Sequence, residues 1–348
     1  NKLLHSPENN NWYQGKDTAS PATGLCTFFE GKVSRVRDSI EAGLRSATAH
    51  FTPPPFTPPH SILPRLASVT PQEVEQLIQS APSKTSPLDI IPICLLKQCA
   101  DLLSIPISHL ANRSFATGRF PGSFKFGLVS PLLKKPGLNV ADYKNFRPIT
   151  NLTTISKLLE RLALARVKSF ITSSPNFCPL QSAYRSSHST ETALVKIMDD
   201  ILSEIDQGSV VSLVSLDISA AFDTICHKTI IQRLEQEFGI VGTALQWFQS
   251  YLSDRTFSVR VGSTSSPPVP ASTGVPQGSV LGPLLFTVYV SPIGRLIESC
   301  HIRYHAYADD TQLFTALKTS VQDNIDRLVC CVEMLQTWFW HNGLLLNP

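Results

Sequence analysis

The sequence predicts an α+β fold in which antiparallel strands pack against amphipathic helices. Residues 301–314 carry apolar side chains at every second position on both sides of Asp309 and Asp310, which is a strand period. Asp is depleted within strands but common in tight turns, so we expect an antiparallel hairpin with both acids at its tip. A further strand is predicted over residues 209–217, whose nearly continuous Val and Leu content is typical of a central strand buried on both faces.

Composition is compatible with one large domain or two. The chain has 348 residues, of which 42% are hydrophobic. It contains no run of about 18 apolar residues and no apolar signal core near its start, so neither a transmembrane helix nor a secretion signal is predicted. The eight cysteines form no CxxC pair, which argues against zinc and suits a reducing, intracellular compartment such as the cytoplasm or nucleus. Because the first residue is not Met and the last follows a predicted helix, we expect a piece of a larger protein.

Basic residues are concentrated in one part of the chain. The net charge is only +3, yet residues 113–185 contain twelve Lys or Arg and two acidic residues. Such a stretch forms either a solvated basic face or a surface for a partner that carries phosphates. We favour the phosphate-bearing partner, because the imbalance is so one-sided.

Composition also divides the N-terminal part of the chain into segments. Residues 1–50 are polar at first and then show a helical pattern around Phe28 and Phe29. Residues 51–69 begin with closely spaced prolines and are expected to be an extended linker. A helix should begin at Thr70 as N-cap, with Glu73 completing a capping box. A second helix is predicted for the latter half of residues 83–103, and the two helices belong to a segment that spans residues 70–115.

The middle of the chain alternates strands and helices. Residues 125–135 read as a strand with a basic tip, and a helix is expected from about 153 to 171. Ser189 or Thr190 caps the next helix, which Gly208 ends. After the strand over 209–217, helices are predicted for 222–238 and 244–252.

The C-terminal part contains a strand, a glycine loop and two helices besides the acidic hairpin. Residues 256–263 alternate as in a solvent-edged strand, with a partner across the proline-rich stretch 266–272. Residues 274–290 open as a glycine loop and continue as an apolar helix. A long amphipathic helix follows the hairpin, from Ser320 to Gly343.

Acidic residues stand at the ends of two predicted strands, Asp217 at one and Asp309 with Asp310 at the other. If these strands are neighbours, Asp217 and Asp309 face each other, and the like charges raise the pKa of one carboxyl. Mg²⁺, which prefers carboxylate and phosphate oxygens, removes that repulsion. Two such ions about 3.5–4 Å apart activate a hydroxyl and stabilise a leaving pyrophosphate. The alternative is an exposed Asp-Asp turn that binds nothing.

Five motifs resemble those of reverse transcriptases from LINE-type, non-LTR retrotransposons. Three look like the core palm motifs: Asp-Ile-Ser-Ala-Ala-Phe-Asp at 217–223, Gly-Val-Pro-Gln-Gly-Ser at 274–279 and Tyr-Ala-Asp-Asp at 307–310. Two look like finger motifs: Phe-Arg-Pro-Ile at 146–149 and Gln-Ser-Ala-Tyr-Arg-Ser-Ser-His-Ser-Thr at 181–190. Any one of them is weak evidence, but five in the family's order and spacing are strong.

The resemblance implies a right-hand polymerase fold, in which fingers are interleaved into a palm whose antiparallel sheet packs on helices. Residues 116–348 would form fingers and palm, and residues 70–115 an N-terminal extension of the fingers, with thumb and endonuclease absent. Residues 28–33 and 83–89 look like the region that precedes the polymerase in vertebrate elements of this kind. The implied function is an RNA-directed DNA polymerase that uses an RNA template, a DNA primer, deoxynucleoside triphosphates and two Mg²⁺ ions, with Mn²⁺ as a substitute.

The resemblance also assigns roles at the catalytic centre. Asp217 and Asp309 would be metal ligands and Asp310 a supporting carboxylate, and the carbonyl of Ile218 would complete the coordination of the second metal. Phe222 would lie beneath the incoming sugar, where its ring clashes with a ribose 2′-hydroxyl and so selects deoxynucleotides. The alternative for Phe222 is a core residue at the start of a helix.

Further residues are implied to contact nucleotide and nucleic acid. Gln277 and Gly278 would border the nucleotide and the template, since glycine lets the backbone approach a ligand closely. Lys134, or Lys135 in its place, and Arg147 would contact the triphosphate and the base, a double task that suits a planar guanidinium. Other candidates are Arg185 for the nucleotide, Tyr307 near the primer end and Lys84 for a backbone phosphate.

Two other functions compete with the active polymerase. The chain could be an inactive retrotransposon relic that binds RNA at most, since a fragment without a thumb lacks part of the primer grip. An RNA-copying RNA polymerase is disfavoured by Phe222, because a ribonucleotide enzyme needs a small or hydrogen-bonding residue at that position.

Overall fold

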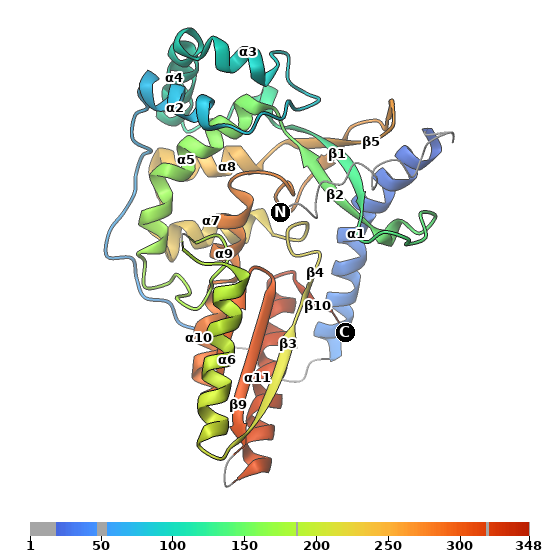
Figure 1. The fold of residues 1–348 in the computed structure, drawn as a ribbon, viewed down its shortest axis with the longest axis vertical. Helices are drawn as coiled ribbons and strands as arrows, with labels where there is room; N and C mark the ends of the chain where they lie inside the picture. Colours follow the sequence, from blue (N-terminus) through green and yellow to red (C-terminus); the bar gives the residue numbers. More distant parts are fainter. Residues whose placement is uncertain (1–18, 47–53, 186, 318–319, 348) are drawn as a thin grey trace. The chain divides into compact units, whose positions relative to one another are not determined.

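The computed structural model describes residues 19–46, 54–185, 187–317 and 320–347, which form two compact units (Figure 1). Among the described residues, unit 1 contains 19–34, Leu63–Ser169 and Ile240–Gly282. Unit 2 contains the described residues within Arg35–Ile62, Phe170–Gly239 and the part of the chain from Pro283. Each unit is therefore assembled from segments that are far apart in the sequence.

A mixed sheet forms the centre of unit 1. Its strands are β1 (Phe126–Leu133), β2 (Phe146–Asn151), β5 (Arg255–Val261), β6 (Thr264–Ser265) and β7 (Val269–Ala271), in the order β2-β1-β5-β6 with β7 also on β5. The predicted strand with a basic tip is confirmed as β1. The prediction that residues 256–263 form a solvent-edged strand is wrong, because β5 has β1 as a parallel partner on one side and β7 antiparallel on the other. Alternation in β5 is thus compatible with an interior strand.

The core of unit 1 includes the start of α1 (Ala19–Ser46), which packs against this sheet. Buried residues of α1 meet buried residues of β1 and β5; among them are Leu25, Cys26, Phe29, Val129 and Val259. The helical pattern predicted around Phe28 and Phe29 is confirmed, and residues 1–18 of the same predicted segment lie outside the described residues. The remaining helices of this unit are α2 (Pro71–Ser80), α3 (Ile93–Gln98), α4 (Ala100–Thr117), α5 (Thr154–Thr172), α8 (Gly242–Leu252) and the short 3-10 turns Gly122–Phe124 and Tyr143–Asn145.

The N-cap of α2 differs in part from the prediction. Thr70 Oγ1 accepts a hydrogen bond of 3.2 Å from the N–H of Glu73, as expected. The carboxylate of Glu73 forms a salt bridge of 2.8 Å with Arg166 instead of turning back to complete a capping box. This salt bridge lowers the pKa of Glu73, and it ties α2 to α5 within unit 1.

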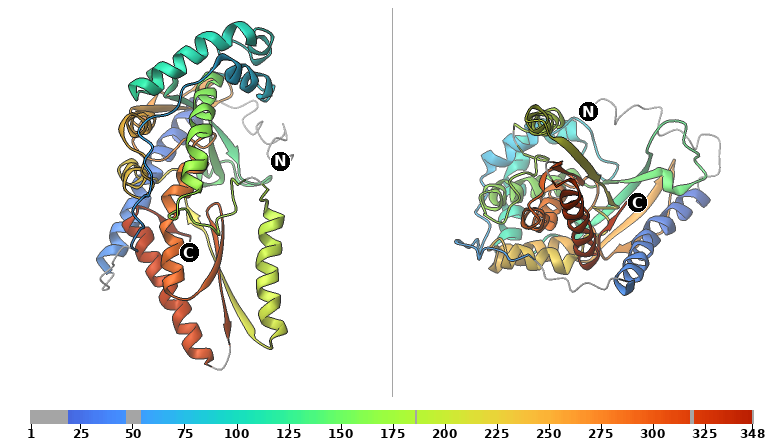
Figure 2. Two further views of the ribbon diagram at one scale, coloured as in Figure 1. Left: turned by 90° about the vertical axis from the view of Figure 1, so that its left-hand side faces the viewer. Right: turned by 90° about the horizontal axis from the view of Figure 1, so that it is seen from below.

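An antiparallel sheet forms the centre of unit 2, with the strand order β3-β9-β8. Its strands are β3 (Val210–Leu216), β8 (Arg303–Tyr307) and β9 (Asp310–Leu317), and a second, two-stranded ladder joins β4 (Ile218–Ser219) to β10 (Leu345–Leu346). The helices of unit 2 are α6 (Thr190–Asp206), α7 (His227–Gln236), α9 (Gly282–Val290), α10 (Pro292–Ser299) and α11 (Val321–His341). Helix α6 lies on one face of the three-stranded sheet, and α10 and α11 lie on the other (Figure 2).

The predicted capping of α6 is confirmed, whereas the predicted burial of β3 is wrong. Ser189 and Thr192 form the reciprocal capping hydrogen bonds, and Gly208 follows α6 with φ 78°. Strand β3 pairs with β9 at the edge of the sheet, and Val210 and Leu213 are 67% and 51% exposed. The central strand is β9, so the apolar run of β3 does not mark a strand that is covered on both faces.

Helix α7 starts later than predicted, at His227 rather than Phe222. Ala220 adopts φ 55°, and its carbonyl accepts hydrogen bonds from the N–H groups of Asp223 and Thr224 at 2.8 and 3.2 Å. A left-handed residue cannot continue a right-handed helix, so Phe222 lies in a turn.

The apolar helix after the glycine loop and the long helix from Ser320 to Gly343 are confirmed as α9 and α11. Within the described ranges, no helix is both long and apolar enough to cross a membrane.

Gly278 provides a test of the packing in unit 1. It adopts φ 127°, and a Cβ added there would lie 2.5 Å from the carbonyl oxygen of Thr150. We expect Gly278→Ala to destabilise the fold by about 1–3 kcal/mol, because it adds backbone strain and a clash with backbone. Gly122→Ala is the control, since a Cβ added at Gly122 would meet open space, with nothing within 4 Å. Urea unfolding that gives equal midpoints for both variants would contradict this account.

Candidate active site

The strand register of unit 2 brings the three candidate catalytic acids to one end of the sheet. Leu216 of β3 pairs with Thr311 of β9, so Asp217 follows directly beside Asp310. Tyr307 pairs with Asp310 across the β8–β9 hairpin, and Ala308 and Asp309 form its turn. The predicted hairpin with both acids at its tip is confirmed, and Asp217 converges on the same tip.

The electrostatics of the acids agree with this convergence. The pKa of Asp310 is raised, first by partial burial and then by the negative charges of Asp309 and Asp217. The side chain of Asp310 is nevertheless solvent-exposed, so water screens much of the repulsion. The three carboxylates thus form a patch of like charge that a cation would stabilise.

The donors at this patch suit a hard divalent cation such as Mg²⁺, which binds carboxylate oxygens. Within the described part of the chain, no group of three or more His, Cys, Asp or Glu side chains is arranged around one point. Mg²⁺ usually takes only one or two carboxylates from a protein and adds substrate phosphates and water. A site that uses Asp217 and Asp309 therefore fits the residues present without a preformed cage.

Asp217 is held by a residue near the end of the described chain, Asn347. The N–H of Asn347 donates to the carbonyl of Asp217 at 2.8 Å, and its side-chain amide donates to the carboxylate of Asp217. The hydroxyl of Ser219 donates to the side-chain oxygen of Asn347. Ile218 is buried between these positions in β4, which pairs with β10. Sequence reasoning did not assign a role to Asn347, because its contact partner lies 130 residues away.

The ring of Phe222 is supported from one side. It stacks on Phe286 of α9 with ring centroids 5.1 Å apart and an interplanar angle of 27°. Phe286 is fully buried, whereas Phe222 is half-buried. The stacking restricts the ring from one side, and Phe222 precedes α7 rather than starting it. The role of Phe222 in nucleotide selection stays a prediction.

Gln277 and Gly278 lie in unit 1, where they are attached to β2. The carbonyl of Gln277 accepts a hydrogen bond of 2.8 Å from the N–H of Thr150. Gly278 lies against the carbonyl of Thr150, as its φ and lack of a side chain permit. Gly278 therefore lies close to the backbone of β2, and the approach to a nucleotide or template predicted for it stays a prediction.

The basic finger candidates lie on the β1–β2 hairpin of the same unit. The N–H of Lys134 donates to the carbonyl of Asn145 at 2.8 Å, and Leu132 pairs with Arg147. Lys134 lies in the bend that follows β1, whereas Arg147 lies within β2, and both residues are exposed.

The remaining candidates have different surroundings. Arg185 in unit 2 donates to the carbonyls of Pro179 at 2.7 Å and Gln181 at 3.4 Å, and its guanidinium lies over the ring of Phe177. Tyr307 is half-buried as the last residue of β8. Lys84 is exposed in a loop of unit 1. The roles of these residues in binding stay predictions.

Tyr184 is an aromatic residue beside the acids to which no role was given. Tyr184 is 46% exposed, and the partial burial of its ring, followed by the charges of Asp309 and Tyr307, raises the pKa of Tyr184 to about 12. Its hydroxyl therefore stays protonated near neutral pH and can donate a hydrogen bond. The sequence signal was only its place in the motif at 181–190.

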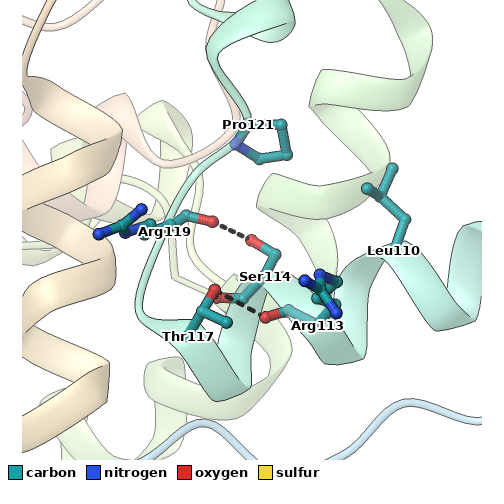
Figure 3. Close-up of a pocket in the computed structure, with 6 residues that line it drawn as sticks. All are labelled: Leu110, Arg113, Ser114, Thr117, Arg119 and Pro121. Atoms are coloured by element: carbon teal, nitrogen blue, oxygen red, sulfur yellow. Dashed lines mark hydrogen bonds between the residues drawn. The ribbon is translucent and has the colours of Figure 1, made fainter.

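A cavity of about 600 Å³ lies in unit 1 around the C-terminal end of α4 (Figure 3). Inside it, the hydroxyl of Ser114 donates to the carbonyl of Arg119, and the hydroxyl of Thr117 donates to the carbonyl of Arg113. Both arginine side chains are exposed. None of the predicted site residues lines this cavity; its lining consists of Leu110, Arg113, Ser114, Thr117, Arg119 and Pro121.

Comparison with known proteins identifies the family. A family model described as "Reverse transcriptase (RNA-dependent DNA polymerase)" matches residues 133–348. The chain belongs to this family. The resemblance to reverse transcriptases of LINE-type elements is thereby confirmed, since the similar proteins come from elements of this type.

Two Drosophila melanogaster proteins and one from Popillia japonica illustrate the similarity. The probable RNA-directed DNA polymerase from transposon BS is 30% identical over 70% of this chain and 27% of its own length. The RNA-directed DNA polymerase from mobile element jockey is 29% identical over 73% of this chain and 28% of its own. The Pol polyprotein from type-1 retrotransposable element R2 is 29% identical over 62% and 30%. The chain thus spans less than a third of the length of these relatives.

Among solved structures, apo telomerase from Candida tropicalis, truncated from its C-terminal domain, aligns with 14% identity and a TM-score of 0.45. The alignment covers 65% of this chain and 49% of that one. The prediction of an α+β fold with an antiparallel sheet packed on helices is confirmed by the elements of unit 2.

The like-charge patch predicts how Asp310 affects stability. The pKa of Asp310 is raised in the folded state, so ionisation of its carboxyl destabilises the fold. This loss of stability is fully present above the folded-state pKa. It disappears as the pH falls through that pKa. Without divalent cations we expect Asp310→Asn to raise the free energy of unfolding near neutral pH by less than about 1 kcal/mol, since solvent screens the site.

Urea unfolding with a chelator, near neutral pH and at about pH 3, measures this effect. The gain of Asp310→Asn should vanish at the lower pH. Asp199→Asn, an exposed acid in the middle of α6, serves as the control and should change little. A loss of stability in Asp310→Asn near neutral pH would refute the repulsion.

Proposed function

We propose that this chain is the polymerising core of a retrotransposon reverse transcriptase, which transfers a nucleotide from a deoxynucleoside triphosphate to a primer 3′-hydroxyl on an RNA template. The observation that carries the proposal is the convergence of Asp217, Asp309 and Asp310 at one sheet end, in a chain that belongs to this family. Three like charges at an exposed strand end cost stability and serve no packing purpose. A cation-dependent reaction gives them a use.

Asp217 and Asp309 would hold two Mg²⁺ ions, with the carbonyl of Ile218 as a further ligand and Asp310 as a supporting charge. When bound, such ions lower the pKa of the attacking hydroxyl and stabilise the leaving pyrophosphate. The protein's part is to present the carboxylates in a fixed direction. The hydrogen bonds from Asn347 support this for Asp217, because they restrict its carboxylate from one side.

Selection of deoxynucleotides is assigned to Phe222. A ring that is stacked on a fully buried neighbour cannot move aside easily, so it would exclude a ribose 2′-hydroxyl. Gln277 and Gly278 would border the nucleotide and the template. Arg185 and Tyr307 would act near the nucleotide and the primer end, respectively.

The nucleic-acid partners are proposed from charge. An exposed basic side chain can exchange its counterions for the phosphates of a template or primer. Within the basic stretch these exposed residues include Arg113, Arg119, Lys134, Lys135, Lys144 and Arg147. Lys134 and Arg147 would take the triphosphate and base of the incoming nucleotide, and Lys84 a backbone phosphate.

Loss of one central carboxylate tests the reaction. With a poly-A template, an oligo-dT primer, dTTP and Mg²⁺, Asp309→Asn should reduce incorporation by at least about a thousandfold, since a metal ligand is removed. Asp199→Asn should retain the rate of the unchanged chain. Absence of incorporation by the unchanged chain, with RNA still bound, would favour the inactive relic.

Steric selection by Phe222 is tested by removing its ring. In Phe222→Ala we expect the preference for dTTP over UTP to fall by about tenfold or more, because a gap replaces the ring that meets the 2′-hydroxyl. Relative kcat/KM values for both nucleotides measure it, and retained use of dTTP is the internal control. An unchanged preference in an active variant would exclude Phe222 as the barrier.

A further inference from the structure

A short segment runs beside β8 on the edge opposite to β9. The N–H of Ala306 donates to the carbonyl of Leu180 at 3.1 Å, and the N–H of Ser182 donates to the carbonyl of Ala306 at 2.9 Å. Gln181 thereby forms a parallel bridge with Ala306. All of these residues belong to unit 2. This segment extends the sheet up to Ala306, just before the turn that carries the acids.

Beyond Ala306 the side chain of Gln181 continues the pairing. The N–H of Ala308 donates to Oε1 of Gln181 at 2.9 Å, and Nε2 of Gln181 donates to the carbonyl of Ala308 at 3.1 Å. Oε1 also accepts from the N–H of Ala183 at 3.0 Å. A planar amide offers one acceptor and one donor side by side, as the peptide group of a neighbouring strand does.

The residue that receives this support is under backbone strain. Ala308 adopts φ 57°, a left-handed conformation that side chains other than glycine disfavour. Asp309 follows it directly, so the direction of the Asp309 carboxylate depends on how the peptide groups of Ala308 are held. Strain of this kind persists only where the surroundings impose it, and here Gln181 contacts both polar groups of Ala308.

Gln181 is itself well fixed. Its side chain is buried, with 2% of the residue exposed. Arg185 donates to the carbonyls of Pro179 and Gln181, which anchors the backbone on either side of the glutamine position. A buried amide with this anchoring has little freedom to turn, so it can fix the position of what it contacts.

We infer that Gln181 is a positioning residue of the catalytic turn: its side-chain amide clamps Ala308 and thereby aims the carboxylate of Asp309. The effect on catalysis rests on the proposed function, whereas the clamp itself concerns only the turn. Gln181 touches neither substrate nor metal in this scheme. It acts through the backbone of Ala308.

Two substitutions of Gln181 test the clamp. Gln181→Leu removes both hydrogen bonds to Ala308, and with them the one from the N–H of Ala183, at similar volume. Gln181→Met does so with a flexible side chain that cores tolerate, which guards against failure to fold. Each leaves the N–H and carbonyl of Ala308 without their buried partner. We expect the amide of Ala308 to exchange its hydrogen about 10- to 100-fold faster, as loss of such a partner implies.

Ser182→Ala is the matched control, since it removes a buried hydrogen bond of 2.8 Å to His305 in the same segment and leaves the contacts of Ala308 intact. The hydrogen-exchange rates of residues 307–310 are measured on the full chain in all variants. The thermal stability of each variant is measured alongside. Faster exchange at Ala308 in both Gln181 variants but not in Ser182→Ala supports the clamp. Equal exchange in all three overturns it.

Primer extension then separates positioning from general damage. In the Gln181 variants we expect kcat to fall about 10- to 100-fold while KM for dTTP and the Kd for template–primer stay within about twofold, because only the aim of Asp309 changes. A fall in kcat no larger than that of Ser182→Ala would overturn the catalytic part. If the unchanged chain does not extend primers, the proposed function fails, and hydrogen exchange still decides the clamp.

Discussion

The pairing of β3 with β9 is the constraint on which the candidate site depends. Seven residue pairs fix these strands from Val210 with Leu317 to Leu216 with Thr311. A shift by one residue would reverse which side chains face the helices, so the packing of the sheet disfavours such a shift. That register places Asp217 beside Asp310, although 92 intervening residues separate them in the chain. Convergence of the charges is therefore a consequence of sheet geometry and does not require attraction between them.

The fold tolerates this convergence because packing outweighs repulsion. Tyr304, Leu313 and Phe314 of the hairpin are at most 4% exposed, and complete burial of one such side chain contributes roughly 1.5–3 kcal/mol. Repulsion among exposed carboxylates at the sheet end is smaller, about 1 kcal/mol or less, because water screens it. The acids are thus held in place by residues several positions away, and their own interactions need not be favourable.

Sequence patterns predicted those features that depend on neighbouring residues. The acidic hairpin and the capped start of α6 follow from local turn and capping chemistry, and both are found. The features that were predicted wrongly or not at all depend on distant partners or on backbone conformation. Strand β5 gains β1 from more than 100 residues away, and the left-handed Ala220 delays α7 without any glycine to signal it. Likewise, the contacts of Gln181 with Ala308 span 127 residues, beyond the reach of a local pattern.

Glu160 in unit 1 shows what a structural carboxylate looks like in this protein. It is fully buried, and it accepts hydrogen bonds from the N–H groups of Val280 at 2.7 Å and Leu281 at 3.1 Å. Tyr251 donates a further one at 3.1 Å, so the cost of burial, which raises the pKa of Glu160, is offset by fixed donors. Asp310 has the opposite surroundings: it is exposed, and its pKa is raised partly by other acids. Glu160, whose neighbours are hydrogen-bond donors, stabilises the loop before α9. Asp310, whose neighbours are other carboxylates, is suited to bind a cation together with them. The surroundings of each carboxylate thus distinguish a structural acid from a candidate catalytic one.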